Sequence, residues 1–246
     1  MKTDRLLVAA CASLALAFIF SCSSEGDGSS SDDGGSSSSN DSNCPIDGYR
    51  TVEINGQIWM AENLNCNVSG SKCYGEDGRV IMGYDQEADE DIFTTLSPAE
   101  VQANCEKYGR LYDWFTANKV CPSGWHLPSN EDWDKLYSFV EDGECEYYDE
   151  SNNYDGIEGY CPTAGKHLKS DRHGFLALPG GVSYGSSGGF LFNGVGDVGY
   201  WWGSSEYNKR GYASYMGFDF YFDDDDAVGW GNSAKAMMYS VRCVKD

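Results

Sequence analysis

The segment CPSGWHLPSNEDWDKL, residues 121–136, carries the signals that decide how this chain folds. Pro128 ends an extended segment, because the residue before a proline is driven out of the helical region. Ser129 is placed to cap a helix, and Asp132 at the third helical position completes a capping box. Acidic residues in the first turn also suit the positive end of the helix dipole. These features predict a strand that is followed directly by a helix.

Apolar residues then recur at the spacing of one helical face. They stand at i, i+3, i+4 and i+7, and are Trp133, Leu136, Tyr137 and Val140. The helix is expected to end near Gly143, since glycine commonly follows the last helical turn. Trp125 and Leu127 are expected to enter the core from the preceding strand, with the helix packed beside them.

Two further elements are predicted upstream of this segment. Residues 50–60 are predicted as a hairpin, because Asn55-Gly56 favours a two-residue turn between alternating apolar positions. A helix is expected to start after Ser97 and to run to Tyr108. Proline stands at its first position, and a glutamate two residues later completes a capping box.

Downstream of residue 170 the chain is rich in glycine and aromatic residues, which favours short strands and loops. Residues 175–178 and 199–202 are predicted as short buried strands. A longer alternating run covers residues 212–222 and returns after a turn at residues 223–226. In the last predicted strand, alternate positions share one face: Tyr239, Val241 and Cys243.

Separate blocks of this sequence resemble the Fibrobacter succinogenes major paralogous domain, in order, from about residue 49 to residue 246. They are TVEINGQIWMAENLN (51–65), YGRLY (108–112), CPSGWHLPS (121–129), LPGG (178–181), GYWWGSSE (199–206) and SVRCVKD (240–246). That family is similar in turn to the C-type-lectin and formylglycine-generating-enzyme group of folds. The resemblance therefore implies an α+β domain of irregular antiparallel strands with two main helices, rich in loops and disulfide bonds. It carries over no biochemical activity.

The first 43 residues are predicted to direct the export of this domain and to tether it to the membrane. Residues 1–21 resemble a lipoprotein signal peptide, with a positive start, an uncharged run and a lipobox-like end. Cys22 is expected to take the lipid, and residues 23–43 contain only serine, glycine, asparagine and acidic residues, which favours a flexible tether. An ordinary signal peptide that is cut elsewhere is the alternative. We expect an outer-membrane lipoprotein, anchored through Cys22 and exposed at the cell surface, whose domain spans residues 44–246.

The charge balance excludes one class of partner. The chain has 39 acidic and 17 basic residues, for a net charge of −22. Nucleic-acid binding depends on neutralising phosphates with basic side chains, so a nucleic-acid partner is not expected. An acidic extracellular protein fits the balance better. Residues 76–96 are longer than the corresponding segment of the family and are interpreted as an acidic surface insertion.

The chain has ten cysteines, of which Cys11 leaves with the leader and Cys22 takes the lipid. The other eight form an even set in an exported chain, which is typical of disulfides, although their spacing leaves the connectivity open. The resemblance implies two of the bonds, Cys73–Cys105 and Cys121–Cys243. The four cysteines that remain then form the local pairs Cys44–Cys66 and Cys145–Cys161. A zinc site is disfavoured, because no C-x-x-C pair occurs and histidines number only three.

No residue is predicted to be catalytic, and no cofactor is expected. His126 lies inside the structural motif, and His167 and His173 lie in a polar loop, so surface or packing roles are expected for all three. A weak calcium candidate is the acidic turn formed by Asp223, Asp224, Asp225 and Asp226. A solvated turn is the preferred interpretation, because EF-hand spacing is absent.

A ligand site is predicted in the C-terminal third, where aromatic rings can stack on sugars while carboxylates and amides bind hydroxyls. The candidate residues are Trp201, Trp202, Glu206, Tyr207, Asn208 and Trp230. Strand alternation requires about half of the aromatic residues in this region to face the core, so only the outward-facing ones qualify.

The leading hypothesis is a non-catalytic, lipid-anchored surface protein whose lectin-like domain binds polysaccharide or another surface ligand. One alternative is an enzyme of carbohydrate or protein modification with acidic catalytic residues that the sequence does not identify. Another is a structural envelope protein. The oxidase activity of formylglycine-generating enzymes is not expected, because they use a reactive cysteine pair and residues 162–246 contain only Cys243. The sequence does not indicate an oligomeric state.

Overall fold

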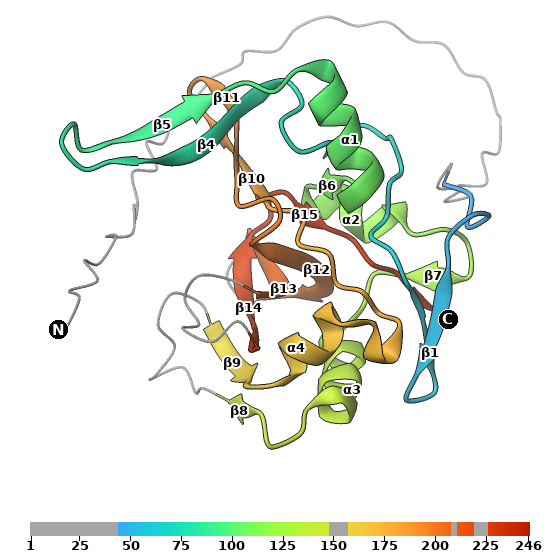
Figure 1. Ribbon diagram of the computed structural model, residues 1–246. Coiled ribbons are helices and arrows are strands. Elements are labelled where there is room, and N and C mark those ends of the chain that lie inside the picture. Colours follow the sequence, from blue (N-terminus) through green and yellow to red (C-terminus); the bar gives the residue numbers. More distant parts are fainter. Residues whose placement is uncertain (1–43, 148–156, 208–210, 219–225) are drawn as a thin grey trace, which may run out of the picture. The chain divides into compact units, whose positions relative to one another are not determined.

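The computed structural model describes residues 44–147, 157–207, 211–218 and 226–246, which all belong to one unit that begins at Ser39. The predicted leader, Cys22 and the tether lie outside these residues. The described chain is α+β, with three sheets whose strand pairs are mostly antiparallel, four α-helices and four disulfides (Figure 1). This confirms the expected α+β class. None of the described helices is long and apolar enough to cross a membrane.

The largest sheet has eight strands, and its centre is the antiparallel set β12 (Gly199–Glu206), β13 (Tyr212–Phe218) and β14 (Val228–Ala234). Strand β15 (Tyr239–Ser240) joins β12 in parallel, which brings the C-terminal segment next to the centre of the sheet. In spatial order the strands are β3 (Ser71–Lys72), β6 (Leu111–Tyr112), β15 (Tyr239–Ser240), β12 (Gly199–Glu206), β13 (Tyr212–Phe218), β14 (Val228–Ala234), β9 (Ile157–Cys161) and β8 (Glu146–Tyr147).

Two four-stranded sheets complete the β-structure of the described residues. One joins the first hairpin to the C-terminus, in the order β1 (Thr51–Ile54), β2 (Gln57–Met60), β16 (Val244–Lys245) and β7 (Trp125–His126). The other has the order β10 (Val182–Ser186), β11 (Gly189–Asn193), β4 (Gly78–Asp85) and β5 (Glu90–Thr94). The predicted last strand is thus divided into β15 and β16, yet its three alternating residues are all buried in one core cluster.

The helices are α1 (Pro98–Tyr108), α2 (Trp114–Val120), α3 (Asn130–Val140) and α4 (Ala164–Lys169), with a 3-10 turn, η1 (Asp171–His173). The predicted caps are present, because Ser97 and Ser129 each accept the N3 backbone N–H while the N3 carboxylate accepts from the cap. The predicted buried face of α3 is confirmed. Helix α3 ends at Val140, three residues before Gly143, and the cap position is Glu141.

The turn of the first hairpin also follows its sequence. Asn55 and Gly56 both have positive φ, at 50° and 75°, and β1 pairs with β2 on either side of them. Positive φ at both central residues defines the hairpin turn that asparagine followed by glycine favours. Helix α2 was not predicted, although Asp113 caps it by accepting the backbone N–H of Thr116.

Residues 175–178 are buried in part but do not form the predicted strand. Leu176 has a φ of +48°, which interrupts an extended conformation. The carbonyls of Phe175 and Leu176 accept hydrogen bonds from the guanidinium of Arg242, in place of a neighbouring strand. The side chain of Arg242 is fully buried, and burial lowers its pKa to about 9.

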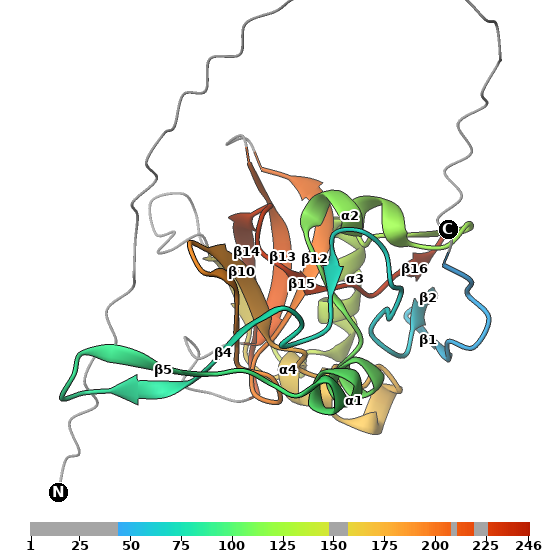
Figure 2. The same cartoon turned by 90° about the horizontal axis from the view of Figure 1, so that it is seen from above.

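Residues 76–96, interpreted as an acidic insertion, form an ordered hairpin. Strands β4 and β5 extend from the body as a two-stranded arm in both views (Figures 1 and 2). The base of the arm is part of the fold, because β4 pairs in parallel with β11 and Val80 is buried. Asp85, Glu87, Asp89, Glu90 and Asp91 lie in or beside the turn of the arm, whereas Glu76 and Asp77 precede β4 at its base.

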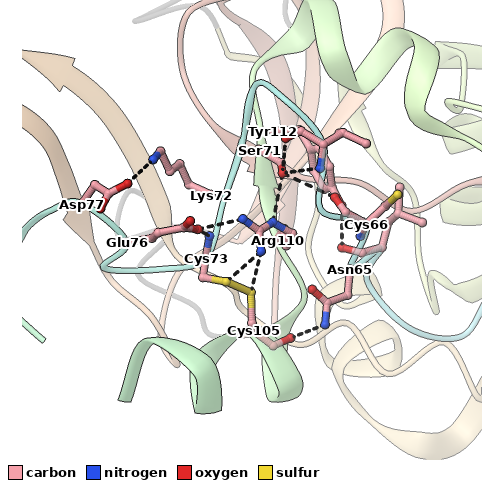
Figure 3. Close-up of polar contacts among 12 residues, drawn as sticks. Asn65, Cys66, Ser71, Lys72, Cys73, Glu76, Asp77, Cys105, Arg110 and Tyr112 are labelled. Carbon is pink, nitrogen blue, oxygen red and sulfur yellow. Dashed lines mark hydrogen bonds and ion pairs between the residues drawn. A yellow bond between two sulfur atoms is a disulfide. The ribbon is translucent and has the colours of Figure 1, made fainter. Parts of the chain in front are cut away.

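A buried arginine holds the segment that leads into this arm (Figure 3). Arg110 donates from Nη2 to the Glu76 carboxylate at 2.7 Å and from Nε to the Ser71 hydroxyl at 2.9 Å. Its Nη1 lies 3.1 Å from the sulfur of Cys73 and 3.5 Å from that of Cys105. The charge is therefore paired and hydrogen-bonded, as a buried charge must be.

The four disulfides join the pairs that the resemblance implied and the two local pairs that remained. They are Cys44–Cys66, Cys73–Cys105, Cys121–Cys243 and Cys145–Cys161. The longest closes 122 residues of sequence and joins the end of α2 to the last strands. The shortest closes 16 residues and joins the segment before β8 to the end of β9.

Candidate functional site

The two adjacent tryptophans of the predicted ligand site, Trp201 and Trp202, lie in the core with no accessible surface. Trp201 donates its indole N–H to Asn63 Oδ1, and Trp202 donates to the carbonyl of Tyr112, both at 2.8 Å. Successive strand residues point to opposite faces, but β12 is covered on both faces, and each ring belongs to a different core cluster. Neither ring is therefore available to stack on a ligand.

Two acidic candidates are engaged in ion pairs. Glu206 pairs with Lys235 at 2.8 Å, and Asp226 pairs with Lys166 at 3.2 Å. The buried Lys235 ammonium also lies 3.9 Å from the ring centre of Trp114, whereas 64% of the Glu206 side chain is exposed. The other acidic-turn and amide candidates lie outside the described residues: Asn208, Asp223, Asp224 and Asp225.

The two remaining candidates, Tyr207 and Trp230, line the same open cavity of about 310 Å³. One wall is a face of α3, whose residues at i, i+3, i+4 and i+7 border it. The other wall comes from the large sheet, from its central strands β13 and β14 and its edge strands β9 and β8. The lining residues are Asn130, Trp133, Asp134, Tyr137, Tyr147, Glu158, Tyr207, Ser214, Tyr215, Trp230 and Gly231.

A continuous row of aromatic rings leads from the core into this cavity. Ring centres are separated by 4.9 Å from Trp59 to Trp133, 6.2 Å from Trp133 to Tyr137 and 5.3 Å from Tyr137 to Trp230. Tyr147 follows at 5.2 Å from Trp230. Trp59 is fully buried, whereas 64% of Tyr147 is exposed. The row therefore begins inside the protein and ends at its surface.

Three buried polar atoms on residues that line the cavity have no hydrogen-bond partner among the described residues. They are the Trp133 indole N–H and the hydroxyls of Tyr137 and Ser214. Burial raises the pKa of Tyr137 well above its ordinary value, with a further contribution from Asp134. The Tyr137 hydroxyl thus stays protonated and able to donate. Five further atoms of this kind belong to residues that do not line the cavity, so the unpaired groups do not by themselves mark a ligand site.

Two carboxylates complete the cavity. Asp134 on α3 is partly buried, and its pKa is raised by burial and then by the nearby charge of Glu131. Glu158 on β9 accepts a hydrogen bond from the side-chain amide of Asn232 at 2.5 Å. The cavity thus combines aromatic surface with hydrogen-bond acceptors, which is the composition of a site for a small polar ligand.

The histidines make contacts typical of structural residues. His126 Nδ1 lies 2.7 Å from Asp246, and its Nε2 lies 3.3 Å from Asp132 in the cap of α3. Buried His167 is 2.8 Å from the Asp142 carboxylate. His173 packs against the ring of Phe139.

In the described residues, one group of three side chains has possible metal-ligand atoms close to one another. It consists of Glu141, Cys145 and Cys161. The two cysteines are bonded to each other, so they offer no thiolate, which is the form that binds metal. Glu141 is already engaged, because it accepts hydrogen bonds from the backbone of Thr163 and Ala164 at the start of α4.

Sequence reasoning missed most of this cavity, including Trp133, Tyr137, Asp134, Tyr147 and Glu158. A local signal was present in α3. Its apolar stripe continues without a break into Asn130 and Asp134, two polar residues on the same helical face. A face that is packed in a core at one end and polar at the other is expected at the border of a cavity.

One comparison with known proteins agrees with the family resemblance of the sequence blocks. The family model of the Fibrobacter succinogenes major domain matches residues 52–245. Among curated proteins and solved structures, no significant match was found. The match covers every strand, helix and cavity residue named above except part of β1, so the cavity lies inside the family's domain.

Proposed function

We propose that this chain, which belongs to the Fibrobacter succinogenes major domain family, is a non-catalytic surface protein that binds polysaccharide in the cavity beside α3. The observation that carries the proposal is the open aromatic cavity itself. Sugars bind by stacking their apolar faces on aromatic rings while their hydroxyls meet carboxylates and amides, and both kinds of group line this cavity.

Each part of the cavity has a role in this proposal. Tyr147 and Trp230 at the outer end of the aromatic row offer ring surface to a sugar. Asn130, Asp134 and Glu158 offer oxygens that accept hydrogen bonds from sugar hydroxyls. The volume of about 310 Å³ lies at the low end for ligand sites, so the cavity holds a short part of a polymer.

The proposal includes the fold relationship that the sequence implied. A C-type-lectin-like or formylglycine-generating-enzyme-like arrangement is supported by the two longer helices, α1 and α3. It is also supported by the bond between Cys121, at the start of the central motif, and Cys243, in the last strands. A solved structure of this domain compared with members of those fold groups tests this part.

The proposal also includes a lipid anchor on Cys22 at the outer membrane, with the domain exposed at the cell surface. Its support is the lipobox-like end of the leader and the polar composition of residues 23–43. Cys22→Ser is expected to release the protein from the membrane fraction. Intact mass that shows cleavage before Cys22 without acyl chains would contradict the anchor.

The binding proposal is tested by retention on immobilised polysaccharides with the full-length protein in detergent. Tyr147→Ala is expected to weaken retention about tenfold or more, because it removes a stacking ring worth about 1–2 kcal/mol. Phe139→Ala is the matched control, since Phe139 is an exposed aromatic residue of α3, 51% accessible, that does not line the cavity. Equal retention of the two variants contradicts the placement of the binding site in the cavity. Release of shortened glycan contradicts the non-catalytic assignment.

A further inference from the structure

The charged groups of the cavity narrow the class of ligand. In the described part of the chain, every charged side chain that lines the cavity is a carboxylate, namely Asp134 and Glu158. Their aromatic neighbours present ring faces that carry partial negative charge. An acidic polysaccharide would meet repulsion here, and a neutral one would leave the carboxylate charge without compensation.

Some other carboxylates of the described residues have basic partners. Glu76 pairs with Arg110, Glu206 with Lys235 and Asp226 with Lys166. Asp134 has no basic partner among the described residues, and Glu131 nearby adds like charge. Its raised pKa, caused by burial and then by Glu131, has the direction expected where a positive charge is missing.

The aromatic geometry points the same way. The rings of Tyr147 and Trp230 are in edge-to-face contact, with planes at 61° and centres 5.2 Å apart, so they do not form a flat platform. A flat platform suits the broad apolar face of a neutral sugar. Tryptophan, in contrast, is the best aromatic partner for a cation.

From these observations we propose that the cavity binds a polysaccharide that carries free, protonated amino groups, with the ammonium held by the aromatic rings of Trp230 and Tyr147 and the carboxylates of Asp134 and Glu158. This inference rests on the proposed function and specifies its ligand class. The net charge of −22 also favours the encounter with a cationic polymer, in a manner that salt weakens.

The test compares two hexasaccharides of equal length by calorimetry at pH 6 with the full-length protein in detergent. One is a glucosamine hexamer with free amino groups, and the other is its fully N-acetylated, uncharged form. The glucosamine hexamer is expected to bind at least about tenfold more tightly, because only its ammonium groups can form cation–π contacts with the rings and ion pairs with the carboxylates of the cavity.

Variants separate the cavity from general attraction. The double variant Asp134→Asn/Glu158→Gln is expected to reduce the ratio of the two affinities to near one. The matched control is Glu106→Gln/Glu144→Gln, which removes the same charge from two exposed residues that do not line the cavity and is expected to keep the ratio. Thermal unfolding of both variants verifies that they are folded.

Each outcome distinguishes this inference from the function on which it rests. Equal affinity of the wild type for both hexamers overturns the cationic ligand and leaves polysaccharide binding in place. A preference that persists in Asp134→Asn/Glu158→Gln overturns the role of the cavity and assigns the preference to net charge. Absence of binding to both hexamers and to all immobilised polysaccharides overturns the proposed function as well.

Discussion

Two groups of aromatic residues, one within β12 and one that runs from α3 to the strands β14 and β8, differ in how their polar atoms are satisfied. In the first, the indole N–H groups of Trp201 and Trp202 each have a partner at 2.8 Å, and neither ring is accessible. In the second, the row from Trp133 to Tyr147, the Trp133 N–H and the Tyr137 hydroxyl lack partners among the described residues. That row opens into a cavity.

This difference separates a structural from a functional use of the same residue types. A buried indole whose N–H is paired contributes its full packing energy and has nothing left to offer a ligand. A ring row with unpaired polar atoms has given up part of that stability, and the outer rings of this row border a cavity. The comparison predicts that changes in the first group act on stability and changes in the second on binding.

The largest effect is expected from the disulfides that close the two regions. Cys243 packs in the cluster of Trp202, and its bond to Cys121 closes 122 residues; Cys121→Ala/Cys243→Ala should cost about 5 kcal/mol of unfolding free energy on the chain-entropy account. Cys145→Ala/Cys161→Ala opens 16 residues and should cost about 3 kcal/mol. Denaturant unfolding of both variants measures the difference.

The shorter bond is expected to matter more for the ligand. Cys145 and Cys161 bracket β8 and β9, which carry Tyr147 and Glu158 into the cavity. Its loss should weaken polysaccharide retention under conditions in which the variant remains folded. A larger stability loss from removing Cys145–Cys161 than from removing Cys121–Cys243 would contradict the assignment of stability to the first region and of binding to the second.

A smaller effect is expected from single tryptophans. Trp202→Ala should cost about 3–5 kcal/mol of stability, because it opens a cavity in a sealed core and removes the partner of the Tyr112 carbonyl. Trp230→Ala should cost about 1–2 kcal/mol, since that ring is only partly buried, and should abolish measurable polysaccharide retention. Chemical denaturation and retention are measured on both; similar stability losses would contradict the comparison.

The smallest effect on stability is expected from two carboxylates on α3, Asp132 and Asp134, whose pKa values shift in opposite directions. Burial favours a higher pKa for Asp132, but the hydrogen bonds from Ser129 and the contact with His126 outweigh it and lower the pKa. Its stabilisation is therefore present above the ordinary carboxylate pKa and lost as pH falls through the lower folded value. The pKa of Asp134 is raised instead, so its ionisation opposes folding as pH rises.

Asparagine at each position tests this contrast. Asp132→Asn should lose about 1 kcal/mol at pH 7, the usual contribution of a helix cap, and the loss should shrink as the pH is lowered below about 4. Asp134→Asn should leave stability within about 0.5 kcal/mol at pH 7 or raise it slightly. Unfolding free energies measured from pH 3 to pH 7 decide the matter, and a larger loss for Asp134→Asn would refute the assignment.

Local signals in the sequence were enough for the elements whose structure depends on neighbouring residues. The Asn55-Gly56 turn, the caps at Ser97 and Ser129, and the buried stripe of α3 all follow from interactions within a few positions. Residues 175–178 were mispredicted for the opposite reason. Their backbone is satisfied by Arg242, which lies more than sixty positions away.

The cavity lies beyond such local signals. Its walls come from α3, β8, β9, β13 and β14, segments that are brought together only by the pairing order of the large sheet. Within α3, the sequence pointed to one apolar face but not to where the core ends along it.

By itself the sequence determined the helix caps, the hairpin turn and the buried face of α3, and its blocks identified the family. Only the tertiary structure decided which tryptophans are sealed and which border a cavity. Alternation along a strand assigns a residue to one of two faces, but β12 is covered on both, so Trp201 and Trp202 are both buried. Trp230 on β14 is partly exposed because it borders the cavity beside α3, together with residues of β8 and β9.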